Sequence, residues 1–154
     1  MDVQKKRVGP WFKRILIGII VLALAAAGIL WYIFNEKFGD TAEAKADYTV
    51  DALAMIGEFI KSDSLANKKY TEKIVIVNGT VSEVERADTT VNIKMVDASN
   101  GSYIIFAFQQ QHLAEAKMIK QGDKVAIKGS CSGGNYSRIL GAEFITFKRC
   151  ALSK

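Results

Sequence analysis

The sequence predicts a mainly β domain with a few short helices, joined to one membrane-spanning helix. An apolar run of 20 residues lies near the N-terminus, over residues 15–34. Beyond residue 70 the apolar side chains repeat with a period of two, which is typical of strands rather than helices. One helical stretch interrupts those strands. The order of strands and helix then distinguishes between the mainly β folds that fit this pattern.

The apolar run is long enough to cross a bilayer. A helix of this length rises about 30 Å, which is the thickness of the hydrocarbon core. No charged residue interrupts the run, so no side-chain charge is placed in lipid. Aromatic residues, which favour the water–lipid boundary, stand at both ends. They are Trp11 and Phe12 at one end and Trp31 and Tyr32 at the other.

The charges on either side of the run predict its orientation. Five Lys and Arg residues lie in residues 1–14, whereas Glu36, Lys37 and Asp40 follow the run. Because basic flanks stay in the cytoplasm, we expect residues 1–14 to form a cytoplasmic tail. The C-terminal domain would then lie outside the cytoplasmic (inner) membrane, held by a single pass.

Two other interpretations of the run compete with a membrane anchor. Residues 25–27 are three alanines that resemble a signal-peptide cleavage site, but seven more residues of the run follow them. The apolar part of a cleaved signal is shorter, at about 7–15 residues. A lipoprotein signal needs a cysteine directly after the run, and the first cysteine is Cys131. We therefore expect an uncleaved signal anchor.

The net charge of the chain is concentrated at the anchor. The chain carries a formal charge of +5, but beyond residue 39 there are 15 Lys and Arg against 14 Asp and Glu, a net charge of +1. The soluble part is therefore nearly neutral and shows no electrostatic signature of a partner with a phosphate backbone. At about 115 residues it has the size of one domain.

The first part of the soluble region is predicted to be a tether followed by helices. Residues 35–47 are polar and rich in alanine, which indicates a tether. Residues 48–61 show apolar side chains at helical spacing after Thr49, a candidate N-cap. Residues 62–64 break this helix and can cap a second short helix that ends at Tyr70. The predicted inward face of the first helix is Val50, Leu53, Ile56, Gly57 and Ile60.

Five strands and one helix follow. Gly79 lies near the middle of the first, long strand, where it permits a bulge or a sharp coil. Asn100 and Gly101 form a tight turn between the second and third strands. Residues 109–120 are a short helical stretch between the third and fourth. Residues 132–142 are rich in Gly and Ser and predict a loop. The strands span 73–85, 90–96, 102–108, 124–130 and 144–152.

This order of elements, with a kinked first strand, is that of the OB-fold, a five-stranded Greek-key barrel. The kink lets the first strand pair with both edges of the sheet as it closes. A β-sandwich would need about seven short strands. We expect a helical segment over 48–70 that packs on the barrel and an OB-fold domain over 71–154.

Several residues in this order resemble the tRNA-anti-like family of OB-fold domains. The similarity covers Val50 to Lys154. Its most specific parts are residues 66–70, Lys73 with the glycine-containing strand after it, and residues 122–129. The resemblance implies a bacterial protein with an OB-fold, of a kind often found behind a membrane anchor or signal. It implies no particular activity, because the family has no settled one.

His112 is the sole histidine of the chain. Some membrane-anchored OB-fold proteins that carry haem use a histidine followed four residues later by a tyrosine. Here that later position is Ala116, and no companion ligand lies at metal-site spacing. We expect a solvated or capping histidine, and neither a metal nor a cofactor.

Cys131 and Cys150 leave three alternatives open: a disulfide, a reactive pair or two packed thiols. They do not form a C-x-x-C motif. In a simple hairpin they would lie too far apart, since bridged Cα atoms must approach within about 7 Å. The long segment between them leaves room for another register, so a disulfide between Cys131 and Cys150 stays a hypothesis.

The candidate binding face follows from the OB-fold, which binds ligands along its second and third strands. Aromatic side chains beside a cation there can stack on a base. Phe106 and Phe108 are expected in the core instead. The candidate face comprises Thr90, Asn92, Lys94, Tyr103, Tyr136 and Arg138.

We therefore expect a membrane-anchored binding or interaction module rather than an enzyme. With one histidine, no Ser-His-Asp or Cys-His arrangement is supported, and residues 132–135 lack the phosphate-binding loop pattern. The expected partner is an envelope protein, a peptide or a glycan. The alternative is an OB-fold protein that binds single-stranded nucleic acid.

Overall fold

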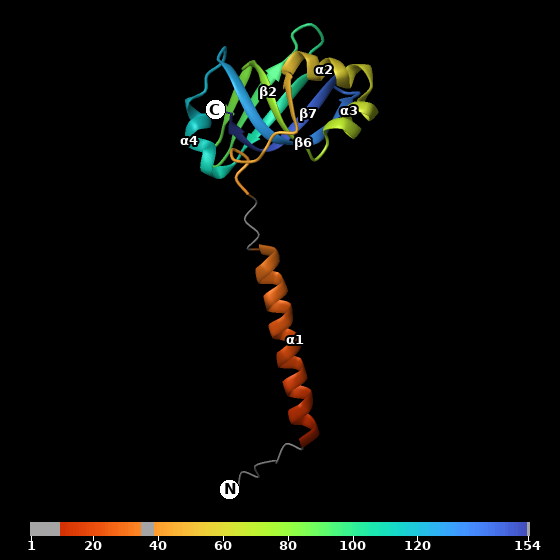
Figure 1. Cartoon of the computed structure of the whole chain (residues 1–154), viewed down its shortest axis with the longest axis vertical. Coiled ribbons are helices and arrows are strands. Elements are labelled where there is room, and N and C mark those ends of the chain that lie inside the picture. The colour runs from red at the N-terminus through yellow and green to blue at the C-terminus, as the bar shows by residue number, and fades with distance from the viewer. Residues whose placement is uncertain (1–9, 35–38, 154) are drawn as a thin grey trace. The chain divides into compact units, whose positions relative to one another are not determined.

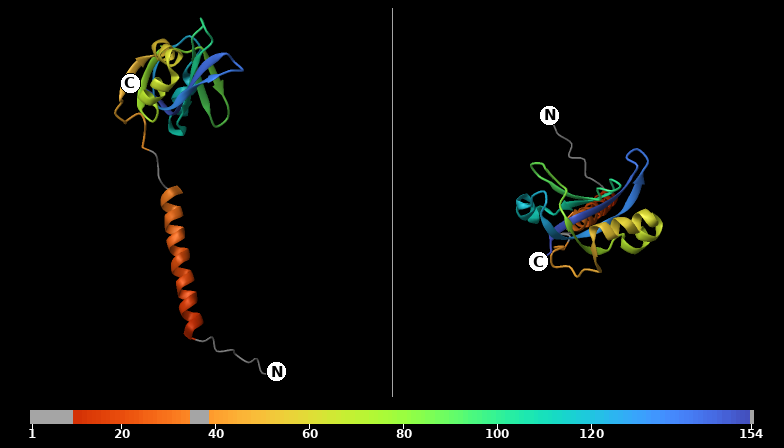
Figure 2. Two further views of the ribbon diagram at one scale, coloured as in Figure 1. Left: turned by 90° about the vertical axis from the view of Figure 1, so that its right-hand side faces the viewer. Right: turned by 90° about the horizontal axis from the view of Figure 1, so that it is seen from above.

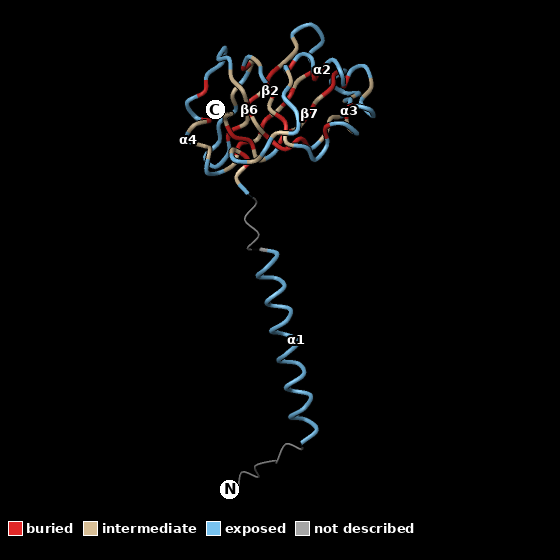
Figure 3. Tube along the Cα trace, viewed as in Figure 1, coloured by how far each residue is buried: buried red, intermediate tan, exposed pale blue. Residues whose placement is uncertain are grey.

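The computed structural model describes residues 10–34 and 39–153, which belong to two separate units. The first unit contains helix α1 (Pro10–Phe34), in red and orange in Figure 1. Residues 10–33 are long and apolar enough to cross a membrane, and their side chains are exposed (Figure 3). The helix begins at Pro10, whose fixed φ suits the first helical position. The rest of the predicted basic tail lies outside the described residues.

The second unit is a β-barrel with the predicted OB-fold order. Its sheet order is β1-β2-β6-β7-β5-β4-β3, with β5 and β7 parallel and the other barrel neighbours antiparallel. Strands β2 and β3 are two halves of the predicted first strand, and β1 is an extra edge strand parallel to β2. The strands are β1 (Tyr48–Asp51), β2 (Ile74–Thr80), β3 (Glu83–Arg86), β4 (Val91–Val96), β5 (Tyr103–Phe108), β6 (Lys124–Ser137) and β7 (Ala142–Leu152).

The first barrel strand bends at Val81 and Ser82 rather than at Gly79. The Val81 N–H donates to the carbonyl of Asp123, whereas the Ser82 N–H donates to that of Lys94 in β4. At this bend the strand passes from pairing with β6 to pairing with β4, and this exchange of partners closes the barrel. Gly79 stays paired within β2, and its missing side chain serves packing: a Cβ there would lie 2.6 Å from the sulfur of Met95.

The chain around residue 48 forms a strand where we predicted a helix. Helix α2 (Ala52–Lys61) starts only after β1, and its N-cap is Asp51, whose carboxylate accepts from the N–H of Leu53, not Thr49. Of the predicted inward face within this helix only Ile56 is buried, whereas Leu53, Gly57 and Ile60 are exposed. The face buried instead has the spacing of an amphipathic helix. It consists of Ala52, Met55, Ile56 and Phe59.

The remaining helices lie at two sides of the barrel. Helix α3 (Asp63–Tyr70) follows α2, and its N-cap is Ser62, the first of the three residues predicted to cap it. A 3₁₀ turn (Gln110–His112) leads into α4 (Leu113–Met118), which replaces the predicted longer helix. Figures 1 and 2 show α2 and α3 on one side of the barrel and α4 on the other. Figure 3 shows the buried residues gathered between them.

The predicted loop over residues 132–142 is mostly strand. Strand β6 continues through the Gly/Ser-rich segment to Ser137, and a short turn leads directly into β7. The glycines are there because helices pack on them: a Cβ on Gly134 would lie 2.6 Å from the ring of Phe59. Asn67 of α3 also bonds to both the N–H and the carbonyl of Gly134, at 2.9 and 2.8 Å.

Candidate functional site

The outer face of β4, β5 and β7 carries an aromatic pair, Tyr103 and Phe144. The two residues are register partners on neighbouring parallel strands, and their rings stack with centroids 6.3 Å apart and planes 26° apart. Both side chains are partly exposed. The alternate residues Ile104 and Ile145 are fully buried, because neighbouring residues of a strand point to opposite sides. The aromatic pair therefore lies on the outside of the barrel.

Lys94 lies beside this pair but is held by carboxylates. Its Nζ is 5.8 Å from the centre of the Tyr103 ring and 3.3 Å from Glu83 of β3, and it also pairs with Glu85. The hydrogen bond to Glu85 raises the pKa of Lys94, and the same bond lowers the pKa of Glu85. Asn92 lies on the same side of β4, two residues from Lys94. The face thus combines stacked rings, an amide and two carboxylates around one paired cation.

The structure brings three of the six predicted face residues together: Asn92, Lys94 and Tyr103. Thr90 precedes β4 and lies in the β3–β4 turn, where its carbonyl accepts from the N–H of Ala87. Arg138 is exposed in the β6–β7 turn.

Tyr136 lies on the other side of the sheet from Tyr103, so its placement beside Tyr103 was wrong. Its register partner is Glu143, whereas Asn135 is opposite Phe144. Sequence reasoning also missed Phe144 itself, because its pairing with Tyr103 joins strands that are distant in the chain. The period-two pattern of β7, in which Phe144 and Thr146 alternate with buried residues, was the available signal.

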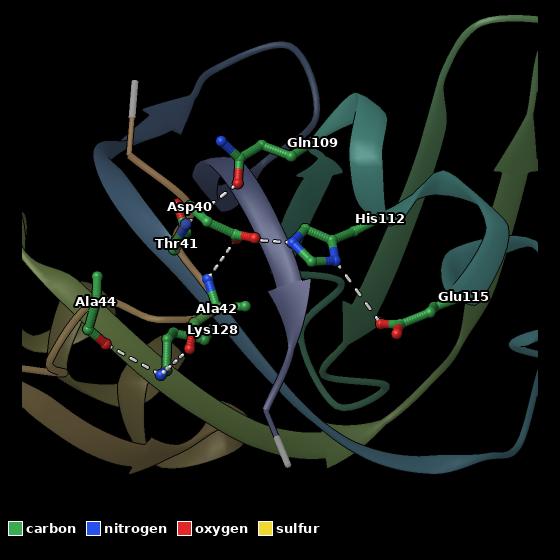
Figure 4. A network of polar contacts seen from close by, with 8 residues as sticks. All are labelled: Asp40, Thr41, Ala42, Ala44, Gln109, His112, Glu115 and Lys128. Atoms are coloured by element: carbon green, nitrogen blue, oxygen red, sulfur yellow. Dashed lines mark hydrogen bonds and ion pairs between the residues drawn. The ribbon is translucent and has the colours of Figure 1, made fainter. Parts of the chain in front are cut away.

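His112 takes part in a polar network that binds residues 39–47 to the barrel (Figure 4). Its Nε2 is 2.7 Å from Asp40, and its Nδ1 is 3.8 Å from Glu115. The hydrogen bond from His112 lowers the pKa of Asp40. The histidine stands at the N-cap position of α4 without a side-chain cap hydrogen bond, and its ring is a hydrogen-bond partner of Asp40 rather than a solvated group.

The same network continues along the segment. Gln109 accepts from the N–H of Thr41 at 3.3 Å, and Lys128 donates to the carbonyls of Ala42 and Ala44 at 2.9 and 3.0 Å. Figure 4 shows these contacts converging on the segment from β6 and from the turn before α4. We call residues 39–47 the clasp. The predicted tether is thus docked on the domain from residue 39 onward.

Cys131 and Cys150 are free, buried thiols on β6 and β7. Burial raises the pKa of Cys131 to about 11 and raises that of Cys150 further. A thiol of raised pKa is a poor nucleophile, because the thiolate is the reactive form. Neither residue lies on the aromatic face, since Cys131 pairs with the buried Phe147 and Cys150 with Phe108 of the core.

The barrel topology defines an OB-fold domain whose outer face carries the aromatic pair. The chain belongs to the tRNA_anti-like family, whose model matches residues 1–140. This agrees with the resemblance that the sequence shows. No curated protein matches the chain.

The solved structures that are similar to the chain include the following two. One, from Klebsiella pneumoniae, is described as a "putative nucleic acid-binding lipoprotein"; it is 21% identical, with a TM-score of 0.55, over 77% of this chain and 100% of that one. The other, described as a "putative aspartyl-tRNA synthetase" from Leishmania major, is 9% identical with a TM-score of 0.44, over 77% of this chain and 22% of that one. The first likeness shows the shared fold.

Proposed function

We propose that this chain is a membrane-anchored binding module that takes a glycan segment of the cell envelope on its aromatic face. The observation that carries the proposal is the composition of that face. Tyr103 and Phe144 offer stacked rings, and around them stand an amide, two carboxylates and a cation that those carboxylates hold. The α1 helix would place the domain outside the cytoplasmic membrane, as the flanking charges favour.

An oligosaccharide fits this chemistry. OB-folds use their second and third strands to bind oligosaccharides as well as oligonucleotides. A sugar ring has an apolar C–H face that can pack on the aromatic pair. Its hydroxyls can donate to Glu83 and Glu85 and bond to the amide of Asn92, because carboxylates and amides are acceptors for such groups. A few polar groups around an apolar platform are the usual design of a small-ligand site.

A phosphate backbone fits the same face less well. Binding to nucleic acid depends on cations that replace counterions along the phosphates. Lys94 is paired with Glu83 and Glu85, and Lys148, farther along the outer side of β7, is 3.1 Å from Glu72. A phosphate would have to displace these carboxylates and then face their charge.

Single-stranded nucleic acid is the second candidate, and two observations favour it. The family bears a name that refers to transfer RNA, and the Klebsiella neighbour is described as nucleic acid-binding. The aromatic pair could also stack on a base, since base stacking tolerates any sequence.

Calorimetric titration of the full chain distinguishes the two candidates. The protein is kept in a detergent without a sugar headgroup, and chitotetraose and a ten-nucleotide oligothymidine are the two probes. We expect saturable binding of chitotetraose that changes little between 50 and 300 mM salt. The Phe144→Ala variant should weaken it about fivefold or more, because one aromatic contact is worth about 1 kcal/mol.

The matched control is Tyr136→Ala, which removes an exposed tyrosine on the other side of the sheet and should leave chitotetraose binding unchanged. If oligothymidine binds and loses affinity steeply with salt while chitotetraose does not bind, the glycan proposal is wrong and nucleic acid takes its place.

A further inference from the structure

A second, smaller site lies near the β6–β7 turn, on the opposite side of the sheet from the aromatic pair. The β6–β7 hairpin extends as a long arm (Figure 2). Near its end is a cavity of about 170 Å³, lined by residues that include Glu143, Tyr136, Ser102 and Ile60. These come from both strands of the hairpin, from the turn before β5 and from the end of α2. Ligand pockets for drug-sized molecules are larger, about 300–1,000 Å³, so this one fits a single side chain.

The carboxyl group of Glu143 gives the cavity its chemistry. Glu143 is 7% exposed, and its Oε2 has neither solvent contact nor a hydrogen-bond partner. The Glu143 N–H donates to the hydroxyl oxygen of Ser102 at 3.1 Å, which fixes the backbone below the carboxyl. Burial raises the pKa of Glu143, and the charge of Asp63 raises it further. A buried acceptor without a donor is unfavourable, so the folded domain keeps one unsatisfied hydrogen-bond acceptor here.

A small cation would supply the missing partner of this carboxylate. Asp63 adds negative charge nearby, and the C-terminal end of α2 contributes the negative end of its dipole at Ile60. A calcium ion would need six to eight oxygen ligands, far more than one carboxylate supplies. A guanidinium carries five N–H donors on a rigid plane, which is more than the one carboxylate lining this small cavity can accept. An ammonium group, which is a compact point charge, fits best.

The rim of the cavity indicates what carries the ammonium group. Tyr136 is 54% exposed and could place its ring beside a cation. Ile60 is also exposed, and Ile139 and Leu140 stand exposed in the adjacent turn. Exposed apolar side chains around a small polar cavity are typical of a protein-binding surface. We propose that this site receives a lysine side chain from a protein partner, with Glu143 as its acceptor and the apolar rim as its docking surface.

The proposal is tested by NMR on the full chain in a nonionic detergent, with ¹³C at the glutamate side-chain carboxyls. The probes are n-butylammonium, n-butanol and the peptide acetyl-Leu-Lys-Leu-amide. We expect butylammonium to shift the Glu143 signal saturably while butanol does not. The peptide should bind at least about fivefold more tightly, because it also covers the apolar rim.

Two variants make the result decisive. Glu143→Gln should abolish the binding of both cationic probes, which is followed in this variant by the backbone amide signals of Ser102 and Tyr136 because the Glu143 carboxyl signal is absent, while the rest of the spectrum stays that of the folded protein. Asp88→Asn, which removes an exposed carboxylate in the β3–β4 turn, should bind them as the parent does. Binding that survives Glu143→Gln, or butanol that binds as well as butylammonium, overturns the ammonium site. A peptide that binds no better than butylammonium overturns the protein partner.

Discussion

At several positions of this fold there is no room for even one side-chain atom, and Gly134 is the clearest case. It lies under Phe59, which is fully buried and has no room to move. We expect Gly134→Ala to destabilise the domain by about 1–3 kcal/mol, the usual cost of overpacking a core. Gly57 is the matched control: it lies in α2 with nothing near its Cβ position, so Gly57→Ala should stabilise by about 0.5–1 kcal/mol.

Chemical denaturation of the full chain measures both changes. If Gly134→Ala were neutral, the close packing of α2 on β6 would be wrong, and the interpretation of the glycine-rich segment as strand would fail with it. Equal effects of the two variants would contradict the account in the same way.

The carboxyl of Glu143 makes a prediction at the same scale. Its pKa is raised in the folded state, so between the ordinary value near 4.5 and that raised pKa the folded protein binds more protons than the unfolded one. Stability must therefore fall as pH rises through this window. We expect Glu143→Gln to raise the melting temperature at pH 7 and to leave it unchanged near pH 4, where the glutamate is protonated.

Thermal unfolding at the two pH values, without ligand, checks this. A variant that is less stable than the parent at pH 7 would mean that the ionised carboxylate has a partner in the fold, and the empty acceptor would be lost as the basis of the lysine site.

At the scale of elements, strands with a regular alternation of apolar and polar residues were predictable from the sequence. Strands that form because of tertiary contacts were not. Val91, Ile93 and Met95 repeat with period two, and β4 forms where predicted. The segment before α2 was wrong because pairing with β2 overrides its helical spacing. The far half of β6 was wrong because its glycines, which read locally as a loop, serve helix packing. Only the tertiary structure contains those partners.

The clasp is an element that the sequence did not reveal, since the bonds that residues 40–44 make to the barrel join residues 68 to 86 positions apart. Asp40 accepts from the N–H of Ala42 and contacts His112, and the N–H of Thr41 donates to Gln109. We expect Asp40→Asn to speed amide hydrogen exchange at Thr41 and Ala42 while β2 keeps its protection. Glu115→Gln is the control, because Glu115 lies 3.8 Å from the same ring, beyond hydrogen-bond distance.

The stability of the docked clasp also depends on pH, and the lowered pKa of Asp40 fixes the direction of that dependence. The pKa of Asp40 is lowered in the folded state. Its contribution to the stability of the docked clasp is therefore present above the ordinary pKa of 3.8 and is lost as pH falls through the lowered pKa. The protection of Thr41 against hydrogen exchange, taken relative to the intrinsic rate at each pH, should thus fall on acidification below pH 4 in the parent. The Asp40→Asn variant should show no such step. A step of the same size in both proteins would contradict the role given to Asp40.

At the scale of the whole molecule, the order of strands predicted the fold, while the site was predicted in part. Three face residues were found because they alternate along neighbouring strands. Phe144 was missed because β5 and β7 meet only through the parallel pairing that the Greek-key path creates. The acids around Lys94 were missed because they lie on β3, beyond the bend of the first strand.

The side of the membrane on which the domain lies decides which partners it can meet, so it tests the central claim most directly. Spheroplasts that make the full chain are treated with protease, and the domain is followed with an antibody against its C-terminus. Our account predicts that the domain is digested in intact spheroplasts while a cytoplasmic marker protein survives. A domain that resists digestion until the spheroplasts are lysed would contradict the account.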